Sequence, residues 1–281
     1  MSARDNHMLL NAETDRPDTP AWPLIGPDDP PPFSWHNERA TRPVVIVADH
    51  ASCAFPRAMN QLGVADWVLD RHVTWDIGSD EVARVLSDLL DAPAILAGYS
   101  RLIVDLNRKL EDPSAFIRVS DGIAIPGNLN LGEREKRERI ESFFRPYHDA
   151  VEARIQAYLD AGVVPALISI HTCTPVFDRI VRPWHVGVLW DRDGRIPVPM
   201  MERLRRMEGI CIGDNEPYSG RHPHDYTIDY HAERLGLPHV GIEVRQDLVS
   251  RQSGARRWAA ILKDALEGVL ADEGLYRAFE G

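Results

Sequence analysis

Residues 44–50 read VVIVADH, an unbroken apolar run that ends in an aspartate and a histidine. Two later stretches repeat this arrangement: ALISIH at residues 166–171 and HVGIE at residues 239–243. Short apolar runs of this kind are typical of strands buried on both faces of a parallel sheet. Because helical patterns separate them, the sequence predicts an α/β fold. Ligands bind beyond the carboxyl ends of strands in open α/β sheets, so two imidazoles and a carboxylate should meet at one edge.

Strand-like and helix-like segments alternate from residue 43 onward. Pro146 falls within the longest helical pattern and should kink or split it, because proline lacks the backbone N–H. Residues 111–132 are rich in Gly, Pro, Asp and Asn, which favours a loop or small flap near the strand ends. Strands are expected near residues 44–48, 93–97, 102–105, 166–170, 185–190 and 239–243, and helices near residues 76–91, 133–161, 198–207, 226–235 and 254–271.

The chain is long enough to bury a core without disulfides, since it has 281 residues, of which 44% are hydrophobic. We expect one domain over residues 44–281. Residues 1–43 are rich in proline, including Pro30-Pro31-Pro32, and read as an extended N-terminal arm. Three aromatic residues favour an arm that docks on the domain: Trp22, Phe33 and Trp35.

Charge and cysteine content exclude several classes of protein. The net charge of −11 argues against a nucleic-acid or anionic-membrane partner, because both require a basic surface. Three cysteines are too few for a disulfide framework, which favours the reducing cytoplasm. Residues 1–11 lack the pattern of a signal peptide, and no stretch is apolar over the length of a membrane span.

Two histidines at strand ends, His50 and His171, are the first candidates for metal ligands. A catalytic zinc ion usually takes three protein ligands, so one ligand is missing from this pair. Asp76 is our choice, although an aspartate where a helical pattern begins can instead cap that helix. His72 is a competing ligand. Asp49 is a competing carboxylate that could instead orient an imidazole.

Glu243 is the candidate general base, because a carboxylate at the end of a buried strand is costly without a function or a partner. A salt bridge to Arg245 or to another arginine is the structural alternative. Cys53 and Cys173 lie near the two histidines and raise the hypothesis of a cysteine nucleophile, but sequence position gives no sign of a lowered thiol pKa.

The segment SRLIVDLNR at residues 100–108 predicts a site for an acidic substrate, since arginine matches a carboxylate with two parallel hydrogen bonds. A surface pair between Arg101 and Asp105 is the alternative, but it leaves Asn107 and Arg108 unexplained. The polar segment at residues 213–220, which contains Tyr218, is by default a turn and could also close over a substrate.

Six segments in order resemble the N-formylglutamate amidohydrolase (N-formylglutamate deformylase) family. They span most of the chain, and their combination is more specific than any one of them. They are DHAS at 49–52, DIG at 76–78, SRLIVDLNR at 100–108, SIHT at 169–172, NEPY at 215–218 and EVRQDL at 243–248.

The resemblance implies a three-layer α/β/α fold with a mixed, mainly parallel sheet, like that of zinc carboxypeptidases, and hydrolysis of N-formyl-L-glutamate to L-glutamate and formate. It implies Zn²⁺, or another divalent metal, held by His50 and His171, with Glu243 as general base. Relatives carry their acidic ligand three residues after the first histidine, where this chain has Cys53, so Asp76 is taken from its place in the family pattern. The implied substrate-binding residues are Arg101, Asn107, Arg108, Tyr218 and Arg245.

The partner implied is a small acidic N-acyl amino acid, and the oligomeric state stays open. An amidase for another N-acyl amino acid or short peptide is the alternative within the same chemistry. A non-catalytic metal- or ligand-binding protein of the same fold is the alternative from another class.

Overall fold

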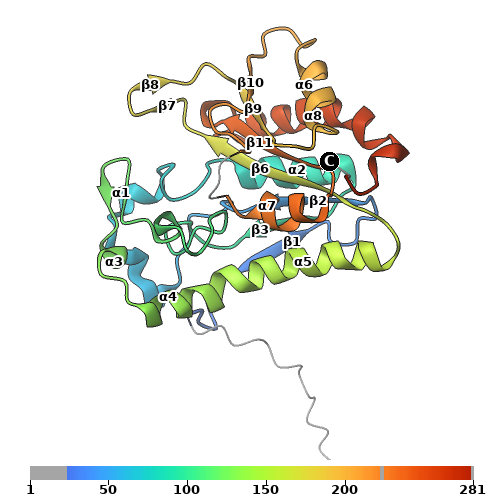
Figure 1. Cartoon of the computed structure of the whole chain (residues 1–281). Helices are drawn as coiled ribbons and strands as arrows, with labels where there is room; N and C mark the ends of the chain where they lie inside the picture. The colour runs from blue at the N-terminus through green and yellow to red at the C-terminus, as the bar shows by residue number, and fades with distance from the viewer. Residues whose placement is uncertain (1–23, 222–224, 280–281) are drawn as a thin grey trace, which may run out of the picture.

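The computed structural model describes residues 24–221 and 225–279. Its centre is a seven-stranded sheet with the order β1-β3-β2-β6-β11-β9-β10 (Figure 1). The pairs β1–β3 and β11–β9 are antiparallel and the other four are parallel, so the sheet is mixed and mainly parallel as predicted. The strands are β1 Phe33–His36, β2 Val44–Ala48, β3 Ala94–Ala97, β6 Ala166–Cys173, β9 Val186–Leu189, β10 Ile212–Asp214 and β11 His239–Arg245.

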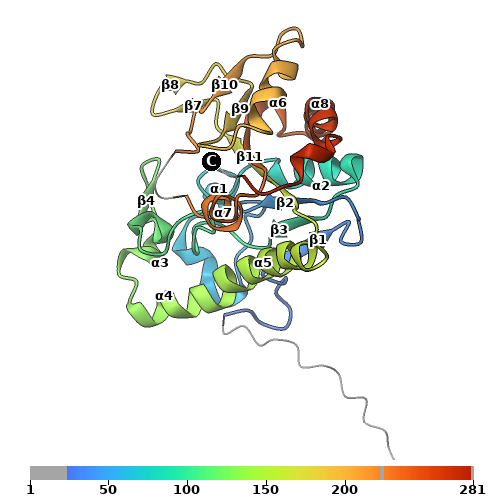
Figure 2. The ribbon, with the colours of Figure 1, turned by 45° about the vertical axis from the view of Figure 1, so that its right-hand side comes forward.

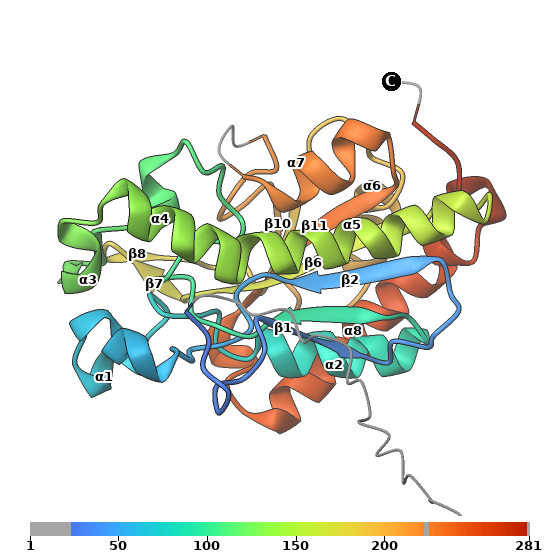
Figure 3. The same ribbon diagram turned by 90° about the horizontal axis from the view of Figure 1, so that it is seen from below.

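Helices cover both faces of this sheet and complete the three layers (Figure 2). Helices α2, α6 and α8 lie on one face, and α5 and α7 lie side by side on the other (Figure 3). The helices are α1 Asp66–Leu69, α2 Ser79–Leu90, α3 Pro126–Leu129, α4 Glu133–Arg139, α5 Arg145–Asp160, α6 Pro197–Leu204, α7 Thr227–His231 and α8 Gln252–Leu270, with a π-helical segment at Ile140–Phe144.

Short elements gather at the carboxyl ends of the parallel strands. The β7–β8 hairpin directly follows β6 and lies on the same side of the molecule as α1 (Figure 1). Two of these pieces are hairpins: β4 Val119–Ser120 with β5 Ile123–Ala124, and β7 Val176–Phe177 with β8 Ile180–Val181. The 3-10 segments within the described residues are Arg57–Gly63, Pro113–Phe116, Glu233–Leu235, Gln246–Leu248 and Glu273–Leu275.

Strand alternation divides the buried side chains between two hydrophobic clusters. In β2, Val44 and Ile46 belong to the cluster under α2 and α8, whereas Val45 and Val47 belong to the cluster under α5. Both sets are fully buried, which is why β2 is apolar at every position. The same alternation in β6 and β11 decides which polar side chains share one face.

The predicted strand at residues 102–105 is wrong. Leu102 and Ile103 are fully buried there, but the backbone follows turns, so the apolar run reflects burial without a strand partner. The long helix is divided into α4, the π-helical segment and α5. The π segment ends two residues before Pro146, with the Arg145 N–H donating to the Ile140 carbonyl.

Several element bounds differ from the sequence-based ones. Strands β6 and β11 run two or three residues further than predicted, so His171 and Glu243 lie inside strands near their carboxyl ends. Residues 33–36, within the expected arm, form β1 and pair with β3 through Trp35 opposite Ile95. Trp22 lies outside the described residues. Within the described ranges, no helix is long and apolar enough to cross a membrane.

Candidate active site

Three buried side chains meet at the carboxyl edge of the sheet: His50, Asp76 and His171. His50 lies two residues after the end of β2, Asp76 lies in the turn before α2, and His171 lies within β6. Asp76 Oδ2 lies 3.3 Å from His50 Nδ1 and 2.9 Å from His171 Nδ1. The three ligand atoms all lie within 4.8 Å of one another, so these residues could hold one metal ion.

A turn, rather than a helix cap, fixes the Asp76 side chain. Helix α2 begins after Gly78, and no side chain caps its first turn, so Asp76 does not play the capping role. The Asp76 N–H donates to the His50 carbonyl at 3.0 Å, and the Thr172 N–H donates to Asp76 Oδ2 at 3.3 Å. The backbone of Asp76 is therefore tied to the segment after β2, and its carboxylate is tied to β6.

The outer nitrogen of each imidazole faces a second buried carboxylate. His50 Nε2 lies 2.7 Å from Asp105 Oδ1, and His171 Nε2 lies 3.5 Å from Asp49 Oδ2. Such carboxylates favour the tautomer with a proton on Nε2, which leaves the Nδ1 lone pair free to bind a metal. Asp49 thus faces His171, and it is not part of the group that could hold the ion. The Tyr147 hydroxyl donates to its other oxygen, Oδ1, at 2.7 Å.

Arg101 holds two of these carboxylates. Its Nε and Nη2 donate to Asp105 Oδ2 at 3.1 and 2.6 Å, and its Nη1 donates to Asp76 Oδ1 at 3.3 Å. The pair between Arg101 and Asp105 does form, but Asp105 is only 5% exposed, so it is a buried contact. The Asn107 N–H donates to Asp105 Oδ1 at 2.9 Å, which leaves this carboxylate well satisfied.

The charge balance of this cluster fits a divalent cation. Asp49, Asp76, Asp105 and Glu243 are buried carboxylates, whereas Arg101 is a permanent cation that bonds to Asp76 and Asp105. Burial acts to lower the pKa of His171, but its contacts with Asp49 and Asp76 outweigh burial and raise it well above the ordinary value. Imidazoles that attract protons this strongly lie in an excess of negative charge, which a divalent cation would balance.

His72, the competing ligand, lies elsewhere. Its Nε2 is 3.6 Å from Asp121 Oδ2, and its ring meets Phe177 edge to face. Burial lowers its pKa. It is not among the residues whose ligand atoms come together around Asp76.

Glu243 lies beside His171 on the neighbouring strand. The two are register partners in the parallel pair β11–β6, so their side chains leave the same face of the sheet. Glu243 is 6% exposed, and its Oε2 has no hydrogen-bond partner in the described part of the chain. Burial raises the pKa of Glu243 to about 7, close to that of a base that works at neutral pH.

The structural alternative for Glu243, a salt bridge to Arg245, does not form. Arg245 instead pairs with Asp247, at 2.8 Å from Nε to Oδ1, and donates to the Arg182 carbonyl at 3.2 Å.

Glycine at residue 187, opposite Glu243 on β9, allows the 213–220 segment to approach. A Cβ atom at Gly187 would lie 2.2 Å from the Glu216 carbonyl oxygen, so a side chain there would displace that segment.

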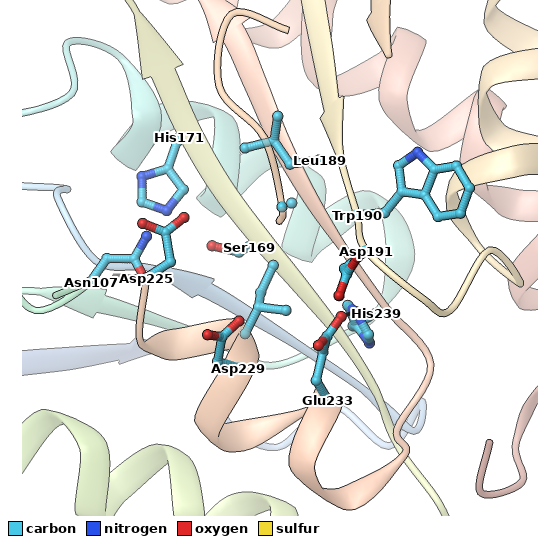
Figure 4. A pocket seen from close by; sticks show the side chains of 13 residues that line it. Asn107, Ser169, His171, Leu189, Trp190, Asp191, Asp225, Asp229, Glu233 and His239 are labelled. Carbon is cyan, nitrogen blue, oxygen red and sulfur yellow. Dashed lines mark ion pairs between the residues drawn. The ribbon is translucent and has the colours of Figure 1, made fainter. Parts of the chain in front are cut away.

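A pocket with about 410 Å³ of empty space, part of it open to solvent, extends from His171 along the α7 face of the sheet. His171, Asn107 and Asp225 lie at one end, and Glu233, His239 and Asp191 lie at the other (Figure 4). Four carboxylate side chains line it: Asp191, Asp225, Asp229 and Glu233.

The two residues of the expected carboxylate clamp reach this pocket by different routes. Asn107 lines it directly, and its Oδ1 accepts the N–H groups of Tyr226 and Thr227 at 3.2 and 3.0 Å. Arg108 forms an ion pair with Asp225 at the same end of the pocket. Tyr218 is 44% exposed, and its hydroxyl accepts a hydrogen bond from Arg182 Nη2 at 3.1 Å.

Burial argues against a cysteine nucleophile, because it raises the pKa of both the Cys53 and the Cys173 thiols. A reactive cysteine requires the opposite shift. Neither Cys53 nor Cys173 is therefore set up for nucleophilic attack.

Sequence reasoning missed two residues that hold the site. Asp105 was considered only as a partner of Arg101, although its place between Arg101 and Asn107 was a usable signal. Tyr147 gave no signal, because it lies in a helix nearly a hundred residues from Asp49.

Comparison with known proteins identifies the family of this chain. The model of the N-formylglutamate amidohydrolase family matches residues 42–250. The N-formylglutamate deformylase of Pseudomonas putida is 24% identical over 209 residues, covering 65% of this chain and 76% of the relative. The span matched by the family model contains His50, Asp76, His171 and Glu243.

Two crystal structures share the fold. A gene product of Agrobacterium tumefaciens is 31% identical, with a TM-score of 0.85 over 88% of this chain and 98% of its own. The N-formylglutamate amidohydrolase of Ralstonia eutropha JMP134 is 23% identical, with a TM-score of 0.59 over 85% of this chain and 95% of its own. Since the family model matches most of the sequence in one span, the chain belongs to the N-formylglutamate amidohydrolase family.

Proposed function

We propose that this chain is a metal-dependent amidohydrolase that cleaves N-formyl-L-glutamate to L-glutamate and formate. The observation that carries the proposal is the placement of Glu243 in register with His171, beside Asp76 and His50. Membership of the family supports the choice of the formyl amide as the bond that breaks.

His50 Nδ1, Asp76 Oδ2 and His171 Nδ1 are the proposed metal ligands, and Zn²⁺ is the proposed ion, with other divalent metals as alternatives. Zinc prefers this set of nitrogen and oxygen donors, and catalytic sites use three of them. When bound, the ion would polarise the formyl carbonyl and lower the pKa of a water molecule. Asp105, 2.7 Å from His50 Nε2, favours the tautomer of His50 that leaves Nδ1 free, and Asp49 faces His171 Nε2 at 3.5 Å.

Glu243 is the proposed general base. One of its carboxylate oxygens takes a proton from the attacking water, and that proton passes to the amine nitrogen as the C–N bond breaks. Its unpartnered Oε2 supports this assignment, because that oxygen is not engaged by another protein group. A pKa near 7 allows the group both to accept and to release a proton at neutral pH.

Asn107 and Arg108 are the proposed clamp for a substrate carboxylate, with Tyr218 at the same edge of the site. Arg108 now pairs with Asp225, which a substrate carboxylate would have to replace or share. For Arg101 we propose a positioning role instead, because its fork of donors is engaged by Asp105 and Asp76. Arg245 remains a candidate, although Asp247 neutralises its charge.

The experiment that tests the proposal is formate release from N-formyl-L-glutamate by the purified full-length protein, with and without chelator, together with elemental analysis. The expected result is chelator-sensitive release with about one metal ion per chain. A panel of N-formyl, N-acetyl and N-succinyl amino acids identifies the acyl group. Metal-loaded protein that releases formate from none of the formyl substrates would contradict the proposal.

A further inference from the structure

The arginines predicted from the sequence already have acidic partners. Arg101 binds Asp105 and Asp76, Arg108 binds Asp225, and Arg245 binds Asp247. A substrate carboxylate at any of these positions has to compete with a protein carboxylate. N-Formyl-L-glutamate carries two carboxylates, so a single clamp leaves the second carboxylate of the substrate without a partner.

Arg182 is different, because it is buried without an acidic partner. It is 7% exposed. Within the described part of the chain, residues 24–221 and 225–279, no ion pair includes it. Its Nη2 donates to the Tyr218 hydroxyl at 3.1 Å, and its Nη1 donates to the Thr174 carbonyl at 3.4 Å. A guanidinium has five N–H donors, so this arginine has donors to spare.

Two aromatic rings fix the plane of this guanidinium. Its central carbon lies 5.0 Å from the centre of the Phe177 ring and 4.7 Å from that of Tyr218. Cation–π contacts of this kind offset part of the cost of burying a charge, but they do not neutralise it. The arrangement holds a rigid, planar cation whose charge is available to an anion.

This cation lies at the catalytic edge of the sheet. The Arg182 carbonyl accepts a hydrogen bond from Arg245, at the end of the strand that carries Glu243. Its Tyr218 partner follows Glu216, whose carbonyl packs against Gly187 opposite Glu243. The charges of Arg182 and Glu243 both influence the pKa of Tyr218, so the three groups share one electrostatic neighbourhood.

The pocket that extends from His171 along the α7 face does not suit a second carboxylate. Asp191, Asp225, Asp229 and Glu233 line it, and like charges at short range repel. An anionic group of the substrate is therefore better accommodated where a buried cation lacks an acidic partner.

We infer that Arg182, held between Phe177 and Tyr218, binds one carboxylate of the substrate, while Arg108 and Asn107 bind the other. This inference deepens the proposed function and rests on it. It makes the site selective for acyl derivatives of dicarboxylic amino acids. It also gives a role to the β7–β8 hairpin, whose Phe177 ring lies against the Arg182 guanidinium.

The test compares Arg182→Gln and Arg182→Lys with the wild-type enzyme in two measurements. Calorimetry gives the affinity for L-glutamate, the product, which needs no turnover. Kinetics gives kcat/KM for N-formyl-L-glutamate, for N-formyl-L-glutamine, and for the analogue with an α-amide. Arg179→Gln is the matched control, since Arg179 is an exposed arginine on the same hairpin.

We expect Arg182→Gln to bind L-glutamate about 100-fold more weakly, because a buried carboxylate then loses its charged partner. Arg182→Lys keeps the charge without the planar fork, and about a 10-fold loss is expected. Arg182→Gln should also stop discriminating between N-formyl-L-glutamate and one of the two amides, and that amide identifies the carboxylate bound. Metal content and the Arg179→Gln control should not change.

Wild-type affinity in Arg182→Gln, or an equal loss for all three formyl substrates, would overturn the inference. If Arg182→Gln does not fold, the lysine variant carries the same test. A wild-type protein that binds L-glutamate through Arg182 without cleaving N-formyl-L-glutamate would refute the proposed function alone. A wild-type protein that binds neither compound would overturn both.

Discussion

The two faces of the central sheet bury different kinds of side chain. The face under α2, α6 and α8 is packed with aliphatic residues and Trp258. The face under α5 and α7 buries His171, Glu243 and the His148–His231 pair among its apolar side chains. Most side chains on both faces are buried, so burial alone does not distinguish the structural face from the chemical one.

Strand β6 shows how one segment serves both faces. Ile168 and Ile170 point into the aliphatic cluster, while Ser169 and His171 point toward the pocket. Because the side chains of a strand alternate, the chemical face can carry polar residues without loosening the other. Substitutions on the two faces should therefore separate stability from activity.

The largest effect is expected for Glu243→Gln, on the chemical face. Removal of the general base should lower kcat by about 10³-fold. Stability should be unchanged or slightly higher, because the variant no longer buries an ionisable group whose pKa is raised to about 7 by burial. Formate release and urea unfolding measure the two quantities, with the exposed Glu202→Gln as control. Near-normal turnover by Glu243→Gln would mean that another group is the base.

Ile168→Ala should have the opposite profile. Ile168 is fully buried on the structural face, and its truncation should lower the free energy of unfolding by about 3 kcal/mol. The kcat of the folded fraction and its metal content should stay at wild-type values. Urea unfolding followed by assays below the transition provides the comparison. A loss of metal affinity in this variant would show that the two faces are coupled.

Acid should act through the chemical face. Burial lowers the pKa of His148 to about 4 and that of His231 to about 3, and their rings meet through Nδ1 and Nε2 at 3.0 Å. The unfolded chain takes up these protons near pH 6.5, before the folded protein does. The stability that this pair contributes is therefore present above pH 6.5 and is lost as pH falls toward 4.

Between pH 6.5 and pH 5 this loss should amount to about 3 kcal/mol for the two histidines together. The measurement is the free energy of unfolding against pH for wild-type protein and for the double variant His148→Gln/His231→Gln. The double variant should have a flatter profile over this range. His36→Gln, at an exposed ion pair, is the control. Parallel profiles for the double variant and the wild type would remove the histidine pair as the cause.

Asp105→Asn should produce the smallest change and sharpens the comparison within the chemical face. The carboxylate that faces His50 Nε2 would be replaced by an amide, and metal affinity should fall about 10- to 100-fold. Competition with a chromophoric chelator measures this affinity, and Asp88→Asn on the surface is the matched control. If the metal affinity of the variant is unchanged, the role of Asp105 is only to hold Arg101.

Prediction from sequence was strongest where a local pattern suffices. The strand at 44–48 and helices α2, α6 and α8 follow from apolar periodicity, which is a property of the residues themselves. The pattern failed at residues 102–105, where an apolar run is buried in turns, and at β1, where a short segment forms a strand only because the edge of β3 is available. Strand pairing depends on a distant partner, which no local pattern contains.

The sequence by itself determined the class of fold, the family and the residue types at the catalytic edge, because apolar runs and polar strand ends are local features. Only the tertiary structure decided which carboxylate faces which imidazole, that Arg101 is engaged by Asp105 and Asp76, and that Arg182 is buried beside Tyr218 with no acidic partner among the described residues. Hydrogen bonds and ion pairs act over a few ångströms. Their partners are therefore set by how strands and loops far apart in sequence are brought together.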